Sequence, residues 1–335
     1  MNSLKDLIVR TLTLWAALST AAPLDNRATS RVIHTFPNPT WLENFAATKG
    51  GNFLTGAMGT SGTEAPLYVV DPLAATTNTT ATLLYAFPGA NSVLGISELE
   101  PNVFVIATST ASLTNGPTVG TSALWCLTLN SASDKGTPIV RKIADLKSAQ
   151  LINGVTVLNK NTVLESDSLA GAIVSVDVKT GSSKTVHTDS SLAPNLTAVT
   201  PYGVNGIKYS APYLYYTNTQ LGVFRVKVDP KTGAAVGSYT KLASLDSPDD
   251  MAVARDGVVY VARPITGEVA RVGSDGKVTV VAGTAGNEIW RGVTSVTLGR
   301  TFSDRNVLYG CTFGGFTADG QGFASGGRVV AVGIA

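Results

Sequence analysis

The chain has 335 residues, of which 14% are charged and 44% hydrophobic, and its formal net charge is +2. Without a Lys/Arg cluster it lacks the concentrated basic face that binds phosphate backbones, which excludes nucleic acid as a partner. No apolar run reaches the roughly 18 residues of a membrane-spanning helix. The 34 glycines and 15 prolines, with few charged residues, are typical of short strands joined by tight turns, so we expect an all-β fold.

The N-terminal segment, residues 1–24, has the features of a secretory signal peptide. Lys5 and Arg10 give it a basic start, Thr11–Leu18 forms a short apolar core, and Ser19–Ala22 supplies small residues for cleavage. A disordered tail is the alternative interpretation. In either case the segment is not expected to belong to the fold.

Residues 25–335 are therefore expected to form the folded domain of a protein in the secretory pathway or outside the cell. Two acceptor sequons for glycosylation, at Asn78 and Asn195, agree with that location. Cys126 and Cys311 could pair in an oxidising compartment, or could remain buried thiols, and the sequence does not decide between these states.

Three stretches of the sequence align with one another: Asn153–Gly181, Asn205–Gly233 and Asp249–Gly276. Each contains a polar starting residue, two strands, a turn with glycine, and an alternating strand that ends in a K-T-G or S-D-G hairpin. A fourth strand follows each of them. An internal period of this kind indicates a repeat architecture.

Three weaker copies open near Glu43, Gly95 and Thr294, which makes six repeats of about 50 residues. The last copy has only three strands, and one predicted strand, Ser30–Phe36, precedes the first repeat and belongs to none of the six. We therefore predict a six-bladed β-propeller that is closed by an N-terminal strand. A pair of β-sandwiches is the alternative, but it explains neither the alignment nor the additional strand.

The first strand of every propeller blade lines the central channel, so the residues that open these strands should meet at one mouth. Four such positions hold oxygen donors: Glu43, Asn153, Asn205 and Asp249. Ca²⁺ prefers carboxylate and carbonyl oxygens, and two carboxylates balance a divalent charge. We predict one divalent cation here, Ca²⁺ before others, in a structural or catalytic role, and no organic cofactor. Alternatively, the Asn-Gly and Asp-Asp pairs only form turns.

The same residues resemble those of the senescence-marker-protein/gluconolactonase family of six-bladed propellers, over about residues 30–335. The resemblance is carried by W-L-E-N around Glu43, by Asn153-Gly154 and Asn205-Gly206, and by Pro248–Met251. It implies that the four oxygen donors hold one cation and that Asp249 is the general base of lactone hydrolysis. No G-x-S-x-G motif is present, which disfavours a serine hydrolase.

Aromatic residues and few charges occupy the loops expected at this mouth. We predict substrate contacts from six residues: Trp41, Asp167, Tyr202, Trp290, Arg291 and Phe313. Such a pocket suits a small, rigid, apolar substrate better than a sugar acid. The two histidines, His34 and His187, fall in outer strands and should not reach the channel. The alternative is that the aromatic rings only pack beneath the loops.

The chain also resembles the fungal secreted branch of this superfamily, in its E-N-F-A strand opening and in Thr217–Thr219 and Val261–Arg263. This branch includes hetero-Diels–Alderases that join a tropolone quinone methide to a humulene-type olefin. Such catalysis needs a cavity that orients two reactants, with donors such as Asn218, Arg263 or Arg291 on the developing oxygen charge.

Two other functions remain open after this resemblance. The four oxygen donors favour a divalent-metal-dependent lactonase or related hydrolase, whereas the aromatic rim and the lack of a channel histidine favour the cyclase. A non-catalytic, small-molecule-binding propeller is the third interpretation. The sequence carries no indication of the oligomeric state.

Overall fold

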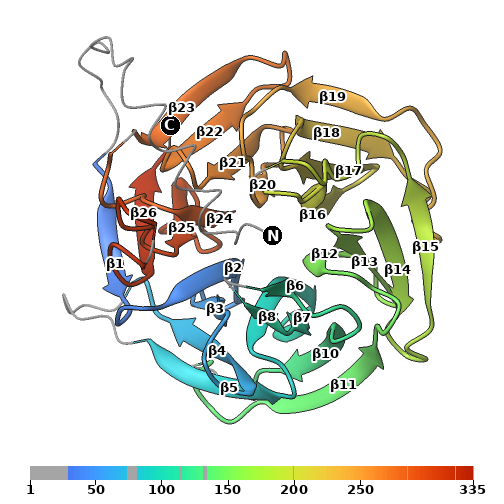
Figure 1. Ribbon diagram of the computed structural model, residues 1–335, viewed down its shortest axis with the longest axis horizontal. Coiled ribbons are helices and arrows are strands. Elements are labelled where there is room, and N and C mark those ends of the chain that lie inside the picture. The colour runs from blue at the N-terminus through green and yellow to red at the C-terminus, as the bar shows by residue number, and fades with distance from the viewer. Residues whose placement is uncertain are drawn as a thin grey trace.

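The computed structural model describes residues 29–73, 81–112, 115–130, 134–198, 200–284, 286–320 and 322–334. Within these ranges the strands form six four-stranded antiparallel sheets, arranged as blades around a central axis (Figure 1). The predicted six-bladed β-propeller is confirmed. The expected leader, residues 1–24, and the sequon at Asn78 lie outside the described residues. No described helix is long and apolar enough to cross a bilayer.

The strands of each blade are given below in their order from the central channel outward. Blade 1 contains β2 (Trp41–Ala47), β3 (Phe53–Met58), β4 (Glu64–Val70) and β5 (Thr82–Pro88). Blade 2 contains β6 (Ser92–Glu100), β7 (Val103–Ser109), β10 (Ala123–Thr128) and β11 (Ile139–Asp145). Blade 3 contains β12 (Ile152–Asn159), β13 (Thr162–Asp167), β14 (Ala172–Asp177) and β15 (Ser183–Thr188).

The other three blades follow the same order. Blade 4 contains β16 (Val204–Ser210), β17 (Tyr213–Asn218), β18 (Gly222–Lys227) and β19 (Thr240–Ala243). Blade 5 contains β20 (Met251–Val253), β21 (Val259–Arg263), β22 (Glu268–Val272) and β23 (Val278–Gly283). Blade 6 contains β24 (Val293–Leu298), β25 (Val307–Thr312), β26 (Arg328–Gly333) and β1 (Arg31–Thr35), and a small hairpin pairs β8 (Ala111–Ser112) with β9 (Gly116–Pro117).

Blade 6 combines strands from the two ends of the described chain. β1 is its outermost strand and pairs antiparallel with β26, with Arg31 opposite Ala331 and Thr35 opposite Arg328. Next to this pair, the buried indole of Trp290 donates a 2.8 Å hydrogen bond to the Ser30 hydroxyl. The N-terminal strand therefore adds a fourth strand to a sheet whose other three strands come last in the sequence.

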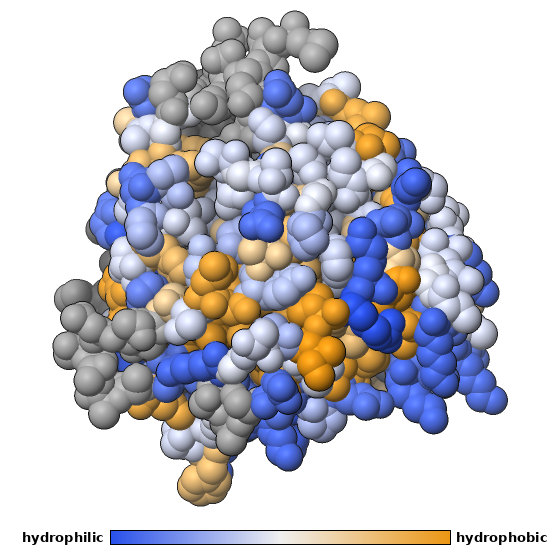
Figure 2. Space-filling model, turned by 90° about the horizontal axis from the view of Figure 1, so that it is seen from below, coloured by the Kyte–Doolittle hydropathy of each residue, from blue (hydrophilic) through white to orange (hydrophobic). Residues whose placement is uncertain are grey.

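The hydrophobic core lies between the blades. Leu54 and Leu67 of blade 1, for example, belong to one buried cluster with Ile96 and Phe104 of blade 2. Apolar residues on both faces of a blade are buried in this way, because each sheet is covered by a neighbour on either side. The edge view in Figure 2 shows that apolar surface occurs in patches interrupted by hydrophilic side chains. Cys126 and Cys311 are free, buried thiols, which decides against a disulfide.

Candidate functional site

A cavity of about 140 Å³ opens at one mouth of the central channel. Its walls are largely apolar, and the apolar residues that line it include Trp41, Met58, Leu94, Leu151, Ile265, Phe313 and Phe316. All four predicted cation ligands also line it: Glu43, Asn153, Asn205 and Asp249. Each of the four is at least nine-tenths buried. The structure thus brings the predicted oxygen donors together in one apolar cavity.

The inner strands position these residues through glycines. Asn153-Gly154 lies within β12 and Asn205-Gly206 lies within β16, so neither pair is only a turn before a strand, as the alternative supposed. A Cβ atom on Gly154 would lie 2.7 Å from the Asn205 carbonyl oxygen, and one on Gly206 would lie 2.6 Å from the Asp250 Cα. Only glycine therefore allows each blade to approach the site residue of the next one so closely.

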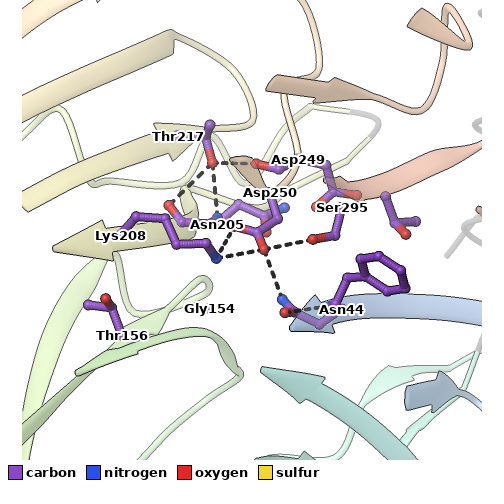
Figure 3. Close-up of polar contacts among 12 residues, drawn as sticks. Asn44, Gly154, Thr156, Asn205, Lys208, Thr217, Asp249, Asp250 and Ser295 are labelled. Atoms are coloured by element: carbon purple, nitrogen blue, oxygen red, sulfur yellow. Dashed lines mark hydrogen bonds and ion pairs between the residues drawn. The ribbon is translucent and has the colours of Figure 1, made fainter. Parts of the chain in front are cut away.

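Hydroxyl groups on second strands fix the same residues. Ser166 of β13 accepts a hydrogen bond from the Gly154 N–H at 2.7 Å and donates one to the Asn205 carbonyl at 2.5 Å. Thr217 of β17 accepts from the Gly206 N–H at 2.9 Å and donates to the Asp249 carbonyl at 2.6 Å (Figure 3). In consecutive blades, a hydroxyl thus joins its own inner strand to a site residue of the next blade.

Burial determines the electrostatics of the two carboxyl groups. Desolvation raises the pKa of Glu43 to about 7, although the Trp41 indole N–H donates a 2.5 Å hydrogen bond to its Oε2 atom. Desolvation and the neighbouring charges of Glu43 and Asp250 hold the pKa of Asp249 well above its usual range. Asp249 therefore favours its neutral form in the protein alone and Glu43 is partly protonated near pH 7, whereas a cation placed between them would favour the ionised form of both.

Next to the carboxyl groups of Glu43 and Asp249, a second polar cluster surrounds Asp250. The Lys208 ammonium lies 2.8 Å from both carboxylate oxygens of Asp250, while Asn44 and Ser295 donate to Oδ2 at 3.1 and 2.9 Å (Figure 3). These partners come from blades 4, 1 and 6. Neither Asp250 nor Lys208 was predicted from the sequence, although a lysine within an inner strand, here β16, is a visible signal.

The donor set fits a hard cation such as Ca²⁺. The Oδ1 atom of Asn205 is buried and has no hydrogen-bond partner among the described residues, so it is available as a ligand. The described residues contain no group of three or more His, Cys, Asp or Glu placed to hold a metal ion. A cation here would therefore rely on the amide oxygens of Asn153 and Asn205 and on water, beside the carboxylates of Glu43 and Asp249.

Three of the predicted substrate residues line this cavity: Trp41, Tyr202 and Phe313. The Trp41 and Phe313 rings stack at a centroid distance of 4.2 Å. Burial and the nearby Glu43 raise the pKa of Tyr202, and its hydroxyl makes no hydrogen bond to another described residue. A fourth predicted residue, Arg291, lines an adjoining cavity and pairs with Glu288. Sequence reasoning missed Thr200 and Thr219, two hydroxyl residues of the wall.

Four other predicted residues do not line the cavity. Asp167 accepts hydrogen bonds from the backbone N–H groups of residues 150, 151 and 170. The Asn218 amide donates to the carbonyls of residues 191 and 193, and Arg263 forms a 2.6 Å ion pair with Glu268. Trp290 is fully buried between blades 5 and 6. Their side chains hold loops and blades together. As expected, His187 lies in outer strand β15, bonded to Tyr239 and the Gly233 carbonyl.

The chain is similar in sequence to two known proteins and in fold to solved structures. No protein-family model matches the chain. It is 27% identical over 332 residues, 89% of this chain and 90% of the relative, to a protein of Phoma sp described as "Putative hetero-Diels-Alderase". It is 26% identical over 312 residues to a Sarocladium schorii protein with the same description, covering 84% of this chain and 77% of that one.

Among solved structures, the calcium-binding protein regucalcin from Agrobacterium tumefaciens is similar in fold. The TM-score is 0.59 at 17% sequence identity, and the match covers 92% of this chain and 94% of regucalcin. At that identity the likeness concerns the fold. The chain thus folds as a six-bladed β-propeller, as regucalcin does, and two proteins that are similar to it in sequence carry the description "Putative hetero-Diels-Alderase".

Proposed function

We propose that the protein is a cyclase of the hetero-Diels–Alderase type, which joins a tropolone quinone methide to a humulene-type olefin in fungal specialised metabolism. The observation that carries the proposal is the apolar, aromatic cavity at the channel mouth, in a chain similar over most of its length to two proteins of that description. Walls of this kind suit reactants without charge.

The chemistry of a hetero-Diels–Alder reaction makes few demands on a protein. A heterodiene and an olefin form two σ bonds and one new π bond at the expense of three π bonds. No proton is transferred, no group leaves and no oxidant is consumed. The protein therefore accelerates the reaction by holding both reactants in attack geometry and by stabilising charge that develops on the oxygen of the heterodiene.

Tyr202 is the residue that we assign to this oxygen. Tyr202 lines the cavity, its hydroxyl has no other hydrogen-bond partner among the described residues, and the raised pKa of the phenol keeps it protonated at ordinary pH. Trp41 and Phe313 would hold a flat, conjugated ring by stacking, since their own rings already stack in the wall. Asn218 and Arg263 are bound to other groups, so we do not assign them a catalytic role.

A divalent-metal-dependent lactonase is the second candidate function. One observation favours it: Glu43, Asn153, Asn205 and Asp249 share the cavity. A divalent cation bound there would supply a Lewis acid for a carbonyl oxygen. Asp249 would then be the base that takes a proton from the attacking water. A cycloaddition does not require this ligand set, so the two functions predict different responses to chelation.

The test is a paired assay of the purified full chain with and without a chelator. One arm contains simple aldonolactones, and the other contains a tropolone quinone-methide precursor with α-humulene. Adduct formation above the uncatalysed rate, unchanged by chelator, supports the cyclase. Lactone opening that the chelator abolishes would show a metal-dependent hydrolase in place of the cyclase. Absence of product in both arms would favour a non-catalytic binding propeller.

A further inference from the structure

A second cavity adjoins the first one on the side of blades 5 and 6. Its volume is about 600 Å³, and three segments line it: the β21–β22 turn, the loop that precedes β24, and the loop between β25 and β26. Ligand sites usually have about 300–1,000 Å³, so the first cavity alone, at about 140 Å³, is small for two reactants, whereas the second has the usual size.

The two cavities share one wall. Pro264, Ile265, Phe313 and Phe316 line both of them. Phe313 stacks on Trp41, which lines the first cavity. The ring centroid of Phe313 also lies 5.0 Å from that of Phe316. A molecule in the second cavity would thus be separated from one in the first by a single layer of side chains. Ile265 is exposed and Phe316 is partly exposed, and we infer that these two side chains move aside when the reactants meet.

The second cavity has a defined rim around Arg291. Gly315 has a φ of 72°, and a Cβ atom there would lie 2.3 Å from the Cγ of Arg291, so the arginine stem crosses the glycine backbone. The guanidinium is paired with Glu288 at the exposed end. Arg291 therefore presents mainly its apolar stem, with the charge compensated, which suits a hydrocarbon better than an anion.

We propose that the second cavity binds the olefin reactant while the first binds the oxygen-bearing reactant. This rests on the proposed cyclase function and deepens it by giving each reactant a separate subsite. Tyr202, whose phenol can donate to a polar oxygen, lines the first cavity and not the second. The shared aromatic wall is then the place where the reacting carbon atoms meet.

The experiment fills each cavity separately and measures both reactants. Ala324→Trp narrows the second cavity, Met58→Trp narrows the first, and Ser238→Trp, at an exposed residue that lines neither, is the matched control. We expect Ala324→Trp to raise the half-saturating concentration of the olefin about tenfold and that of the quinone-methide partner less than twofold, with the reverse for Met58→Trp. Equal effects of Ala324→Trp on both reactants, or on neither, would overturn the proposal.

Direct binding separates this proposal from the proposed function. Tryptophan fluorescence is titrated with α-humulene and, separately, with tropolone, and each variant is first shown to keep the unfolding midpoint of the parent chain. Loss of α-humulene binding in Ala324→Trp but not in Ser238→Trp supports the second subsite even if no adduct forms. If the parent chain forms adduct while Ala324→Trp binds α-humulene unchanged, only the second subsite fails. If the parent chain does not bind α-humulene, the subsite proposal is also wrong.

Discussion

The hydroxyl of Thr217 donates a 2.6 Å hydrogen bond to the backbone carbonyl of Asp249, across the boundary between blades 4 and 5. The same oxygen accepts from the Gly206 N–H, so one side chain ties a site residue to the inner strand of the preceding blade. Thr217→Val keeps the shape but leaves both backbone groups unsatisfied, which costs about 1–3 kcal/mol for a buried group. We expect the variant to unfold at lower denaturant concentration and to lose adduct formation about tenfold or more.

Thr217→Ser is the control for this change, because it keeps the hydroxyl. Urea unfolding and initial adduct rates should show it close to the parent chain. Equal damage in the Ser and Val variants would mean that the methyl packing, and not the hydrogen bond to Asp249, holds the site.

Removal of the Tyr202 hydroxyl tests the assigned oxygen contact. Tyr202→Phe should lower kcat for adduct formation by about tenfold, since one hydrogen bond to developing charge is lost, with little change in stability. Tyr209→Phe, at the opposite mouth of the channel, is the matched control. A kcat for Tyr202→Phe equal to that of Tyr209→Phe would remove the phenol from the reaction.

Calorimetric titration with CaCl₂ tests the oxygen ligands without reference to activity. We expect a single Ca²⁺ site per chain in the parent protein, abolished in Glu43→Gln because a carboxylate is lost from the ligand set. Glu64→Gln, at the exposed start of β4, should bind as the parent does. Retention of Ca²⁺ by Glu43→Gln would show that the four residues do not form the site.

Glu165 makes stability depend on pH. Its carboxyl group is buried in β13, neither oxygen has a hydrogen-bond partner among the described residues, and desolvation raises its pKa from 4.5 to about 8. Because the folded pKa exceeds the unfolded one, its contribution is fully present below pH 4.5 and is lost as pH rises through 8. Urea unfolding at pH 6 and pH 9 should show a smaller loss of stability in Glu165→Gln than in the parent chain. Equal losses would contradict the assignment.

Trp290 should behave as a core residue and not as a substrate contact. Its indole is fully buried and packs on Gly310, where a Cβ atom would lie 2.7 Å from the ring. Trp290→Ala should cost about 3–5 kcal/mol of unfolding free energy, as measured by denaturant titration. Unchanged stability with lost turnover would return Trp290 to the site.

The sequence predicted the fold and the meeting of four site residues because both follow from the internal repeat. Once the repeats are aligned, Asn153, Asn205 and Asp249 occupy equivalent places, and propeller geometry brings such places to one mouth. The regular backbone of the repeats was therefore sufficient to predict that these residues meet. The glycine after each asparagine strengthened the alignment, although its physical role, the close approach of the next blade, is visible only in three dimensions.

The directions of loop side chains could not be predicted in this way. Asn218 and Arg263 were assigned to the substrate from their places near strand ends, but a strand end does not determine whether a side chain turns to the cavity or to unpaired backbone groups. Nearby carbonyls bind the Asn218 amide, and Glu268 pairs with Arg263. Lys208 and Asp250 were missed because their pairing joins different blades, which no local pattern reveals.

The pairing of β1 with β26 sets an order of events during synthesis. Residues 31–35 leave the ribosome long before their partner strand, residues 328–333, is made. Until then β1 is an unpaired edge strand that another chain could bind, and its contact with β26 joins segments that are far apart in the sequence. A protein that is cut short before residue 328 therefore lacks β26, and β1 then has no strand to pair with in blade 6.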